Sequence, residues 1–199
     1  MTDSLFLPFT PVGRARELRA IEVKSKLGVA EYDPVDPFQV LDGVPARLIG
    51  EDCLEQCSET TRKCLLADHS DTWSAVCYGC IGGAGEALIL LNPTHHPNRQ
   101  RVSLMEEIVH ILLDHPPTEL VFDGDGFWTR PFDSVMEKEA YSVGAACIIP
   151  YRTLFNWIRT EGADPRAMAQ RFGVSTQYVE FRVRDAGLYR VYKKARAAS

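Results

Sequence analysis

The stretch that decides the fold runs from Arg101 to His115 and reads Arg-Val-Ser-Leu-Met-Glu-Glu-Ile-Val-His-Ile-Leu-Leu-Asp-His. Its second half is apolar around most of its circumference, which predicts a buried helix. Residues four apart on a helix share a face, so Glu106 and His110 project together. Carboxylates and an imidazole beside such a segment need partners, because an unpaired buried charge is costly. A metal ion is one such partner, and the alternative is an arginine: Arg99, Arg101 or Arg130.

This segment differs by one residue from the His-Glu-x-x-His motif. In that motif two histidines on one helical face bind zinc, and the glutamate serves as the general base of a metallopeptidase. Here Glu106 stands where the first histidine would be, Glu107 keeps the position of the base and His110 keeps that of the second ligand. Residues 137–150 predict a second helix, which can bring a third ligand.

Size and composition limit the class of protein. The 199 residues fit one compact domain or one domain with a small appendage. With 45% hydrophobic and 25% charged residues, the chain is typical of globular proteins rather than disordered or fibrous ones. No apolar run approaches the roughly 20 residues that span a bilayer, and residues 1–9 lack the pattern of a secretory signal. We therefore expect a cytoplasmic protein with no membrane partner.

Charge divides the chain unevenly. Residues 151–199 carry ten Lys or Arg and four Asp or Glu, a net +6, whereas residues 1–150 carry twelve and twenty-three, a net −11, and together these give −5. We predict one unit over residues 1–150 and a basic helical unit over residues 151–199. Residues 166–183 have the spacing of a helix-turn-helix, so DNA is one candidate partner of the basic unit. The acidic residues 1–150 of the same chain are the other candidate partner.

The six cysteines suggest two alternatives. Cys53, Cys57 and Cys64 would share one face of a helix, and Cys77 and Cys80 form a Cys-x-x-Cys pair, so a structural zinc site is conceivable. However, residues 73–80 read as a strand, where positions three apart point to opposite faces. Buried free thiols are the other interpretation, and they also suit Cys147.

Hydrophobic periodicity and turn residues outline the remaining elements. We expect helices over 13–27, 52–66, 154–159, 165–172 and 176–186, a short helix ending at residue 41, and the two helices that carry Glu106 and Glu139. Strands are expected over 44–49, 73–80 and 86–91, the last two forming a hairpin. Residues 118–132 are expected to form a loop or a short strand.

Several of these stretches, in this order, resemble the ImmA/IrrE family of small bacterial metallopeptidases. The similar segments are Leu27-Gly-Val, Pro34 to Pro37, Trp73-Ser-Ala75, Ile89 to Pro93, Arg99-Gln-Arg101, Leu104 to His115, Glu137 to Pro150, and Phe172 to Ser175 followed by Val179 and Arg182. The resemblance implies an α+β fold: a minimal zincin-like core of helices and a small sheet, here followed by the helix-turn-helix-like unit. It also implies a zinc-dependent endopeptidase whose substrate is a repressor protein.

Carried over by position, the resemblance makes Glu106, His110 and Glu139 the metal ligands and Glu107 the catalytic base. The departure is Glu106, where the family motif has histidine. Two glutamates and one histidine neutralise a divalent ion, which makes it a weaker Lewis acid. Zinc is the leading expectation, and manganese is the alternative because oxygen-rich sites suit harder ions better. His95 or His96 can lend a nitrogen instead. His115 is turned away from the ligand face, so a packing or supporting role is expected for it.

Three functions are therefore compared. The leading one is a metal-dependent endopeptidase that cleaves a repressor-type protein. The second is a peptidase fold with impaired catalysis that binds a partner through the former cleft, and the third is a DNA-associated regulator that acts through residues 151–199.

Overall fold

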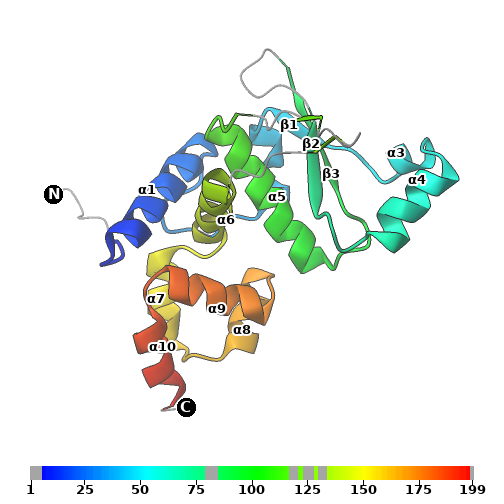
Figure 1. Cartoon of the computed structure of the whole chain (residues 1–199). Helices are drawn as coiled ribbons and strands as arrows, with labels where there is room; N and C mark the ends of the chain where they lie inside the picture. Colours follow the sequence, from blue (N-terminus) through cyan, green and yellow to red (C-terminus); the bar gives the residue numbers. More distant parts are fainter. Residues whose placement is uncertain (1–5, 79–84, 117–120, 123–127, 130–133, 198–199) are drawn as a thin grey trace.

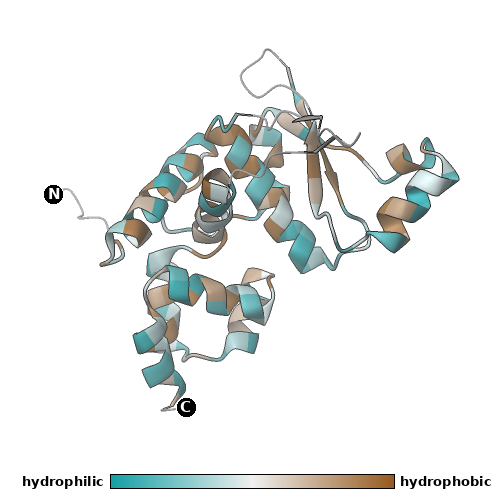
Figure 2. Cartoon of the chain, viewed as in Figure 1, coloured by the Kyte–Doolittle hydropathy of each residue, from teal (hydrophilic) through white to brown (hydrophobic). Residues whose placement is uncertain are grey.

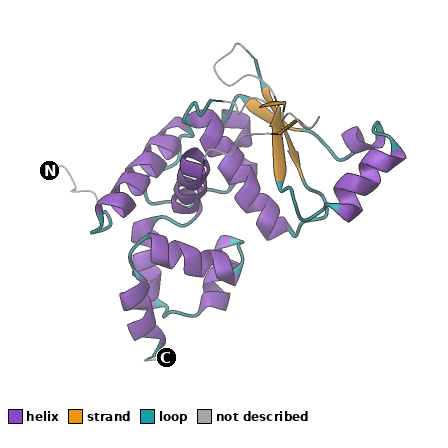
Figure 3. Cartoon of the chain, in the orientation of Figure 1, coloured by secondary structure: helices purple, strands orange, loops and turns teal. Residues whose placement is uncertain are grey.

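The computed structural model describes residues 6–78, 85–116, 121–122, 128–129 and 134–197 (Figure 1). Helices predominate and are drawn on both sides of a small sheet, so the predicted α+β class is confirmed (Figure 3). Hydrophobic residues are prominent on the strands, whereas the last helix is largely hydrophilic (Figure 2). Among the described residues, no helix combines the length and apolar character needed to cross a bilayer.

The main sheet contains β1 (Ala46–Leu48), β2 (Ala75–Tyr78) and β3 (Ala87–Leu91) in the order β1-β3-β2. β2 and β3 are antiparallel, which confirms the predicted hairpin, and β1 runs parallel to β3. Ala87 and Ile89 on β3 are buried because they alternate onto the face covered by helices. β4 (Val121–Phe122) and β5 (Trp128–Thr129) form a separate antiparallel ladder of two strands.

Three long helices form the core beside the sheet: α1 (Pro11–Lys26), α5 (Pro97–Leu112) and α6 (Ser134–Ile148). Proline begins both α1 and α5, where its missing N–H has no intrahelical role. α5 contacts the sheet on one side and α6 on the other. At the crossing of α5 and α6, Gly144 lies against Met105 and the backbone of Glu106. Because Gly144 has no side chain, α6 can pack closely against the part of α5 that carries Glu106.

The predicted helix over 52–66 is wrong as one continuous element. The chain instead forms α3 (Asp52–Glu55), α4 (Glu59–Lys63) and a π-helical turn, η2 (Cys64–Asp68). The break falls where the Ser58 hydroxyl accepts a hydrogen bond from the Thr61 N–H and begins a new helix. Two other short elements, α2 (Pro37–Val40) and η1 (Leu41–Gly43), precede β1.

The C-terminal segment contains α7 (Tyr151–Thr160), α8 (Pro165–Phe172), α9 (Thr176–Asp185) and α10 (Tyr189–Arg196). α8 and α9 are joined by a turn with Gly173 at φ 63°, where the sequence predicted a glycine turn between two helices. α10 was not expected from the sequence. The completely buried Arg182 of α9 ties this segment to the core, since it donates to Ile149 O and pairs with Glu17 of α1.

Candidate metal centre

Three side chains on two helices converge on one point. Glu106 and His110 of α5 and Glu137 of α6 each offer a ligand atom, and these atoms lie within 4.8 Å of one another. His110 Nε2 is 3.7 Å from Glu137 Oε2. All three residues are half-buried. Such spacing suits a divalent cation held by one imidazole and two carboxylates.

Glu137 lies with Glu106 and His110, whereas the sequence had favoured Glu139 as the third member of the set. The two residues are roughly 200° apart around α6, so only one of them can face His110. Glu139 instead lies 3.7 Å from His115 Nε2 and 3.5 Å from Arg19 Nε. Both glutamates are visible in the sequence, but the rotation of α6 against α5 decides between them.

Glu106 lies among further acidic side chains. Burial, together with the negative charges of Glu107 and Glu137, raises the pKa of Glu106 from 4.5 to about 8. The arginines proposed as partners are used elsewhere: Arg101 pairs with Asp36 and Arg99 donates to Ser74 Oγ, while Arg130 lies outside the described residues. A divalent cation would balance two carboxylates, so this donor set fits a metal.

His115 faces the centre, contrary to the expectation that its position turns it away. Its Nδ1 lies 3.0 Å from Nδ1 of His110, and the two rings meet edge to face with centroids 4.9 Å apart. The expectation assumed a helix that continues through His115. α5 instead ends at Leu112, and Asp114 adopts a left-handed conformation that folds the chain back.

A cavity of about 710 Å³ lies beside Glu106. One wall comes from α5, and the other includes Gln177 and Tyr178 of α9, so the C-terminal segment helps to enclose it. Tyr141 of α6 also lines it, and burial, with the charge of Glu106, raises the pKa of the Tyr141 hydroxyl. These residues were not identified as site residues from the sequence, because they are far apart in the chain and carry no motif.

The two loop histidines have local roles. His96 Nδ1 accepts a hydrogen bond from the Asn98 N–H and so caps α5. His95 is buried next to Asn92, and desolvation followed by the charge of Arg99 lowers its pKa. Within the described residues, the ligand cluster includes neither of them.

The cysteines form no metal cluster in the described part of the chain. Cys147 is a buried thiol whose pKa burial raises to about 12, which agrees with the free-thiol interpretation. Cys64 is exposed, and Cys53, Cys57 and Cys77 are half-buried. Cys80 lies outside the described residues, so the Cys-x-x-Cys pair as a whole is not described.

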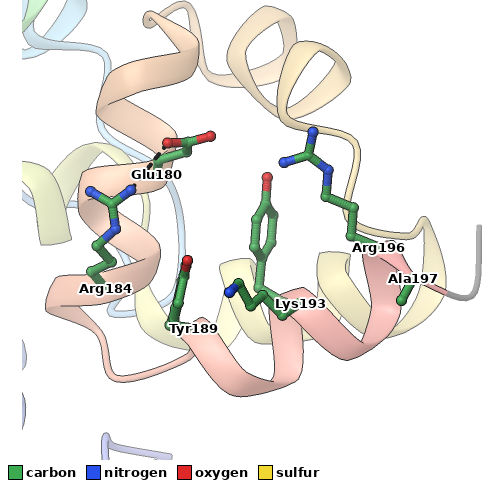
Figure 4. Close-up of a pocket in the computed structure, with 7 residues that line it drawn as sticks. Glu180, Arg184, Tyr189, Lys193, Arg196 and Ala197 are labelled. Carbon is green, nitrogen blue, oxygen red and sulfur yellow. Dashed lines mark hydrogen bonds and ion pairs between the residues drawn. The ribbon is translucent and has the colours of Figure 1, made fainter.

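The basic C-terminal unit presents its charges mainly around α10. Arg184, Lys193 and Arg196 surround a pocket of about 320 Å³ together with Glu180, which pairs with Arg184 (Figure 4). Tyr192 lines the same pocket but is only 2% exposed, and Tyr178 and Leu188 are also buried. These side chains are core residues, as expected, and do not form a stacking platform for nucleic-acid bases.

Comparison with known proteins adds one finding. A search of curated proteins finds no match to the chain. The model of the IrrE N-terminal-like domain, a peptidase family, matches residues 68–184, which is more than half of the chain. The matched range contains Glu106, Glu107, His110 and Glu137, and it confirms the resemblance inferred from the motifs. The chain therefore belongs to the IrrE N-terminal-like family of peptidases, Peptidase M78.

Proposed function

We propose that this protein is a metal-dependent endopeptidase that cleaves a repressor-type regulatory protein in the cytoplasm. The observation that carries the proposal is the meeting of Glu106, His110 and Glu137 within 4.8 Å beside an open cavity. Membership of a peptidase family supports the reaction class. The repressor as substrate follows from the resemblance to ImmA/IrrE proteins.

Glu106, His110 and Glu137 would hold the divalent metal. Zinc is the leading candidate and manganese the alternative, because two carboxylates make the donor set oxygen-rich. When bound, the metal supplies Lewis acidity toward the scissile carbonyl and toward water. The formal charge of the ligands cancels that of the ion, so we expect slower hydrolysis than at a site with two histidines.

Glu107 is assigned as the general base. It follows Glu106 directly on α5 and is half-buried, and its negative charge contributes to the raised pKa of Glu106. Its carboxylate would take a proton from the attacking water and deliver that proton to the leaving amine nitrogen. The peptide bond is thereby replaced by a carboxyl and an amine, and Glu107 returns to its starting state.

The cavity wall supports binding of an extended peptide segment. Tyr141 is protonated at neutral pH, since burial raises its pKa above the ordinary value of about 10, so its hydroxyl can donate a hydrogen bond to a substrate oxygen. We propose that residues 1–150 form the peptidase unit and that residues 151–199 form a second unit, whose α9 completes the wall through Gln177 and Tyr178.

The proposal is tested by Glu107→Gln with metal content and cleavage measured together. The substrate to assay is a repressor-type protein whose gene is found to neighbour that of this chain, and exposed Glu161→Gln is the matched control. We expect Glu107→Gln to retain zinc or manganese by elemental analysis and to lose cleavage, while the control keeps both. Unchanged cleavage would remove Glu107 as the base. Wild-type protein that stays metal-free under zinc and manganese supplementation would favour a binding module that uses the same cleft.

A DNA partner rests on the charge of residues 151–199 and on the helix-turn-helix spacing of residues 166–183. The net +6 of residues 151–199 and the exposed Arg184, Lys193 and Arg196 support it. Arg182 of α9 is buried inside the molecule, so it cannot contact DNA. Salt-dependent binding of random duplex DNA that is lost in a Lys193→Glu, Arg196→Glu variant would support this partner.

A further inference from the structure

We propose that Arg99 selects peptide substrates that carry a carboxylate about three residues from the scissile bond. The carboxylate belongs to an acidic side chain or to the C-terminus of the peptide, and binding measurements separate these two sources. The inference deepens the proposed function and rests on it for the position of the scissile bond, beside Glu106.

The guanidinium of Arg99 lies at the edge of the cavity without a carboxylate partner. Its Nη2 donates to Ser74 Oγ at 3.0 Å, and both residues line the cavity. Among the described residues, no carboxylate forms an ion pair with Arg99, whereas nearby Arg101 pairs with Asp36. An arginine has about five N–H donors in a planar fork, and the contact with Ser74 uses one of them. The others can bind a carboxylate at two points, the geometry that a guanidinium favours.

The surroundings of Arg99 favour a negative group. Arg99 and Glu106 are the only arginine, lysine, aspartate or glutamate among the described residues that line the cavity. The first turns of α5 and α9 meet at the Arg99 end, where Asn98 Nδ2 donates to Val174 O at 3.0 Å. The N–H groups of these turns add partial positive charge to the full charge of the guanidinium. A carboxylate at this end therefore meets a complementary charge.

The spacing along α5 sets the length of the substrate segment. Arg99 and Glu106 are seven residues apart, close to two helical turns, so both project from one face of the helix. Ser103 lies between them on that face and also lines the cavity. A rise of about 1.5 Å per residue separates the two positions by about 10 Å along the helix axis. An extended peptide covers this distance in about three residues, since each adds about 3.3 Å.

A purely structural role for Arg99 predicts a different result. The contact with Ser74 joins α5 to the residue before β2, and it is exposed. If this contact were the whole role of Arg99, its loss would affect acidic and neutral peptides equally. A specificity role changes the ratio between the two kinds of peptide, so that ratio is the quantity to measure.

The first test measures binding and needs no cleavage. Fluorescein-labelled nonapeptide mixtures carry Glu or Gln at the central position, random neutral residues elsewhere and an amidated C-terminus. By fluorescence anisotropy with Glu107→Gln protein, we expect the Glu mixture to bind roughly five- to tenfold more tightly than the Gln mixture. The preference should vanish when Arg99→Gln is added and persist when Arg166→Gln is added, a change at an exposed arginine of α8.

A third mixture, with central Gln and a free C-terminal carboxylate, identifies the source of the negative group. Tighter binding of this mixture than of its amide, again dependent on Arg99, would assign the site to the peptide C-terminus. Equal binding of all three mixtures would overturn the inference, and so would a preference that Arg99→Gln leaves unchanged.

The second test maps cleavage sites in a mixed peptide library by mass spectrometry. We expect the wild type to cut bonds that have a carboxylate two to four residues away on one side, and Arg99→Glu to favour Lys or Arg at that position. Enrichment at no position, or the same acidic preference in Arg99→Glu, would contradict the role of Arg99. Failure of the proposed function looks different: the wild type would cut no peptide, while the binding measurement would still decide whether Arg99 holds a carboxylate.

Discussion

Replacement of Arg182 by Met tests what holds the C-terminal helices against the core. The guanidinium is completely buried, donates to Ile149 O at 2.9 Å and pairs with Glu17 of α1. Burial lowers its pKa to about 10, so it remains charged at neutral pH. Met keeps much of the aliphatic volume and removes the charge and all of the donors.

The expected loss of unfolding free energy is about 3–5 kcal/mol, the cost of removing one partner from a buried ion pair. Most of this cost arises because Glu17, which is 4% exposed, is left buried without its cation. Loss of Arg182 affects the second nearby carboxylate, Asp185, less, because Asp185 still forms an ion pair with Arg16. A loss of this size is a large part of the roughly 5–15 kcal/mol that stabilises an ordinary domain.

The unfolding free energy is measured by urea denaturation followed by far-UV circular dichroism. The slope of that free energy against urea concentration is compared between variants, because an unchanged slope shows that only stability has changed. The control is the double variant Glu17→Gln, Arg182→Met, which removes both charges. We expect it to lie only about 1–2 kcal/mol below the wild type, since the remaining loss is that of hydrogen bonds. A change below about 1 kcal/mol in Arg182→Met, or a double variant no more stable than the single one, would refute the reasoning.

Three further outcomes are expected. Lys24→Met should raise the unfolding free energy by about 2 kcal/mol at pH 7, because burial lowers the pKa of Lys24 from 10.5 to about 8. The wild type should gain stability as the pH rises from about 8 to 10.5, so the difference in unfolding free energy between the two proteins should shrink. A difference that does not depend on pH would argue against this cause. Zinc at about 100 times its dissociation constant should stabilise the wild type by about 3 kcal/mol over chelator-treated protein, and this effect should disappear in Glu106→Ala; its persistence there would place the metal elsewhere. Tyr141→Phe should slow cleavage about tenfold or more with metal content unchanged, and full activity in the variant would remove the hydroxyl from the reaction.

Much of the fold is predictable because it follows from local patterns. The α5 helix, the β2–β3 hairpin and the turn at Gly173 are set by hydrophobic period, by proline and by glycine at a left-handed position. The helix expected over 52–66 failed for a local reason as well. Ser58 begins a new helix there, and its capping preference outweighed the periodic placement of the cysteines.

The sequence alone determined that Glu106 and His110 share a face of α5, with Glu107 beside them, because the helical period depends only on residues a few positions apart. It could not choose between Glu137 and Glu139, since that choice depends on how α6 is rotated against α5. Nor could it bring His115 back to His110, or turn α9 toward the cavity. Those placements come from a left-handed turn and from the packing of distant helices, whose energies are shared among many residues.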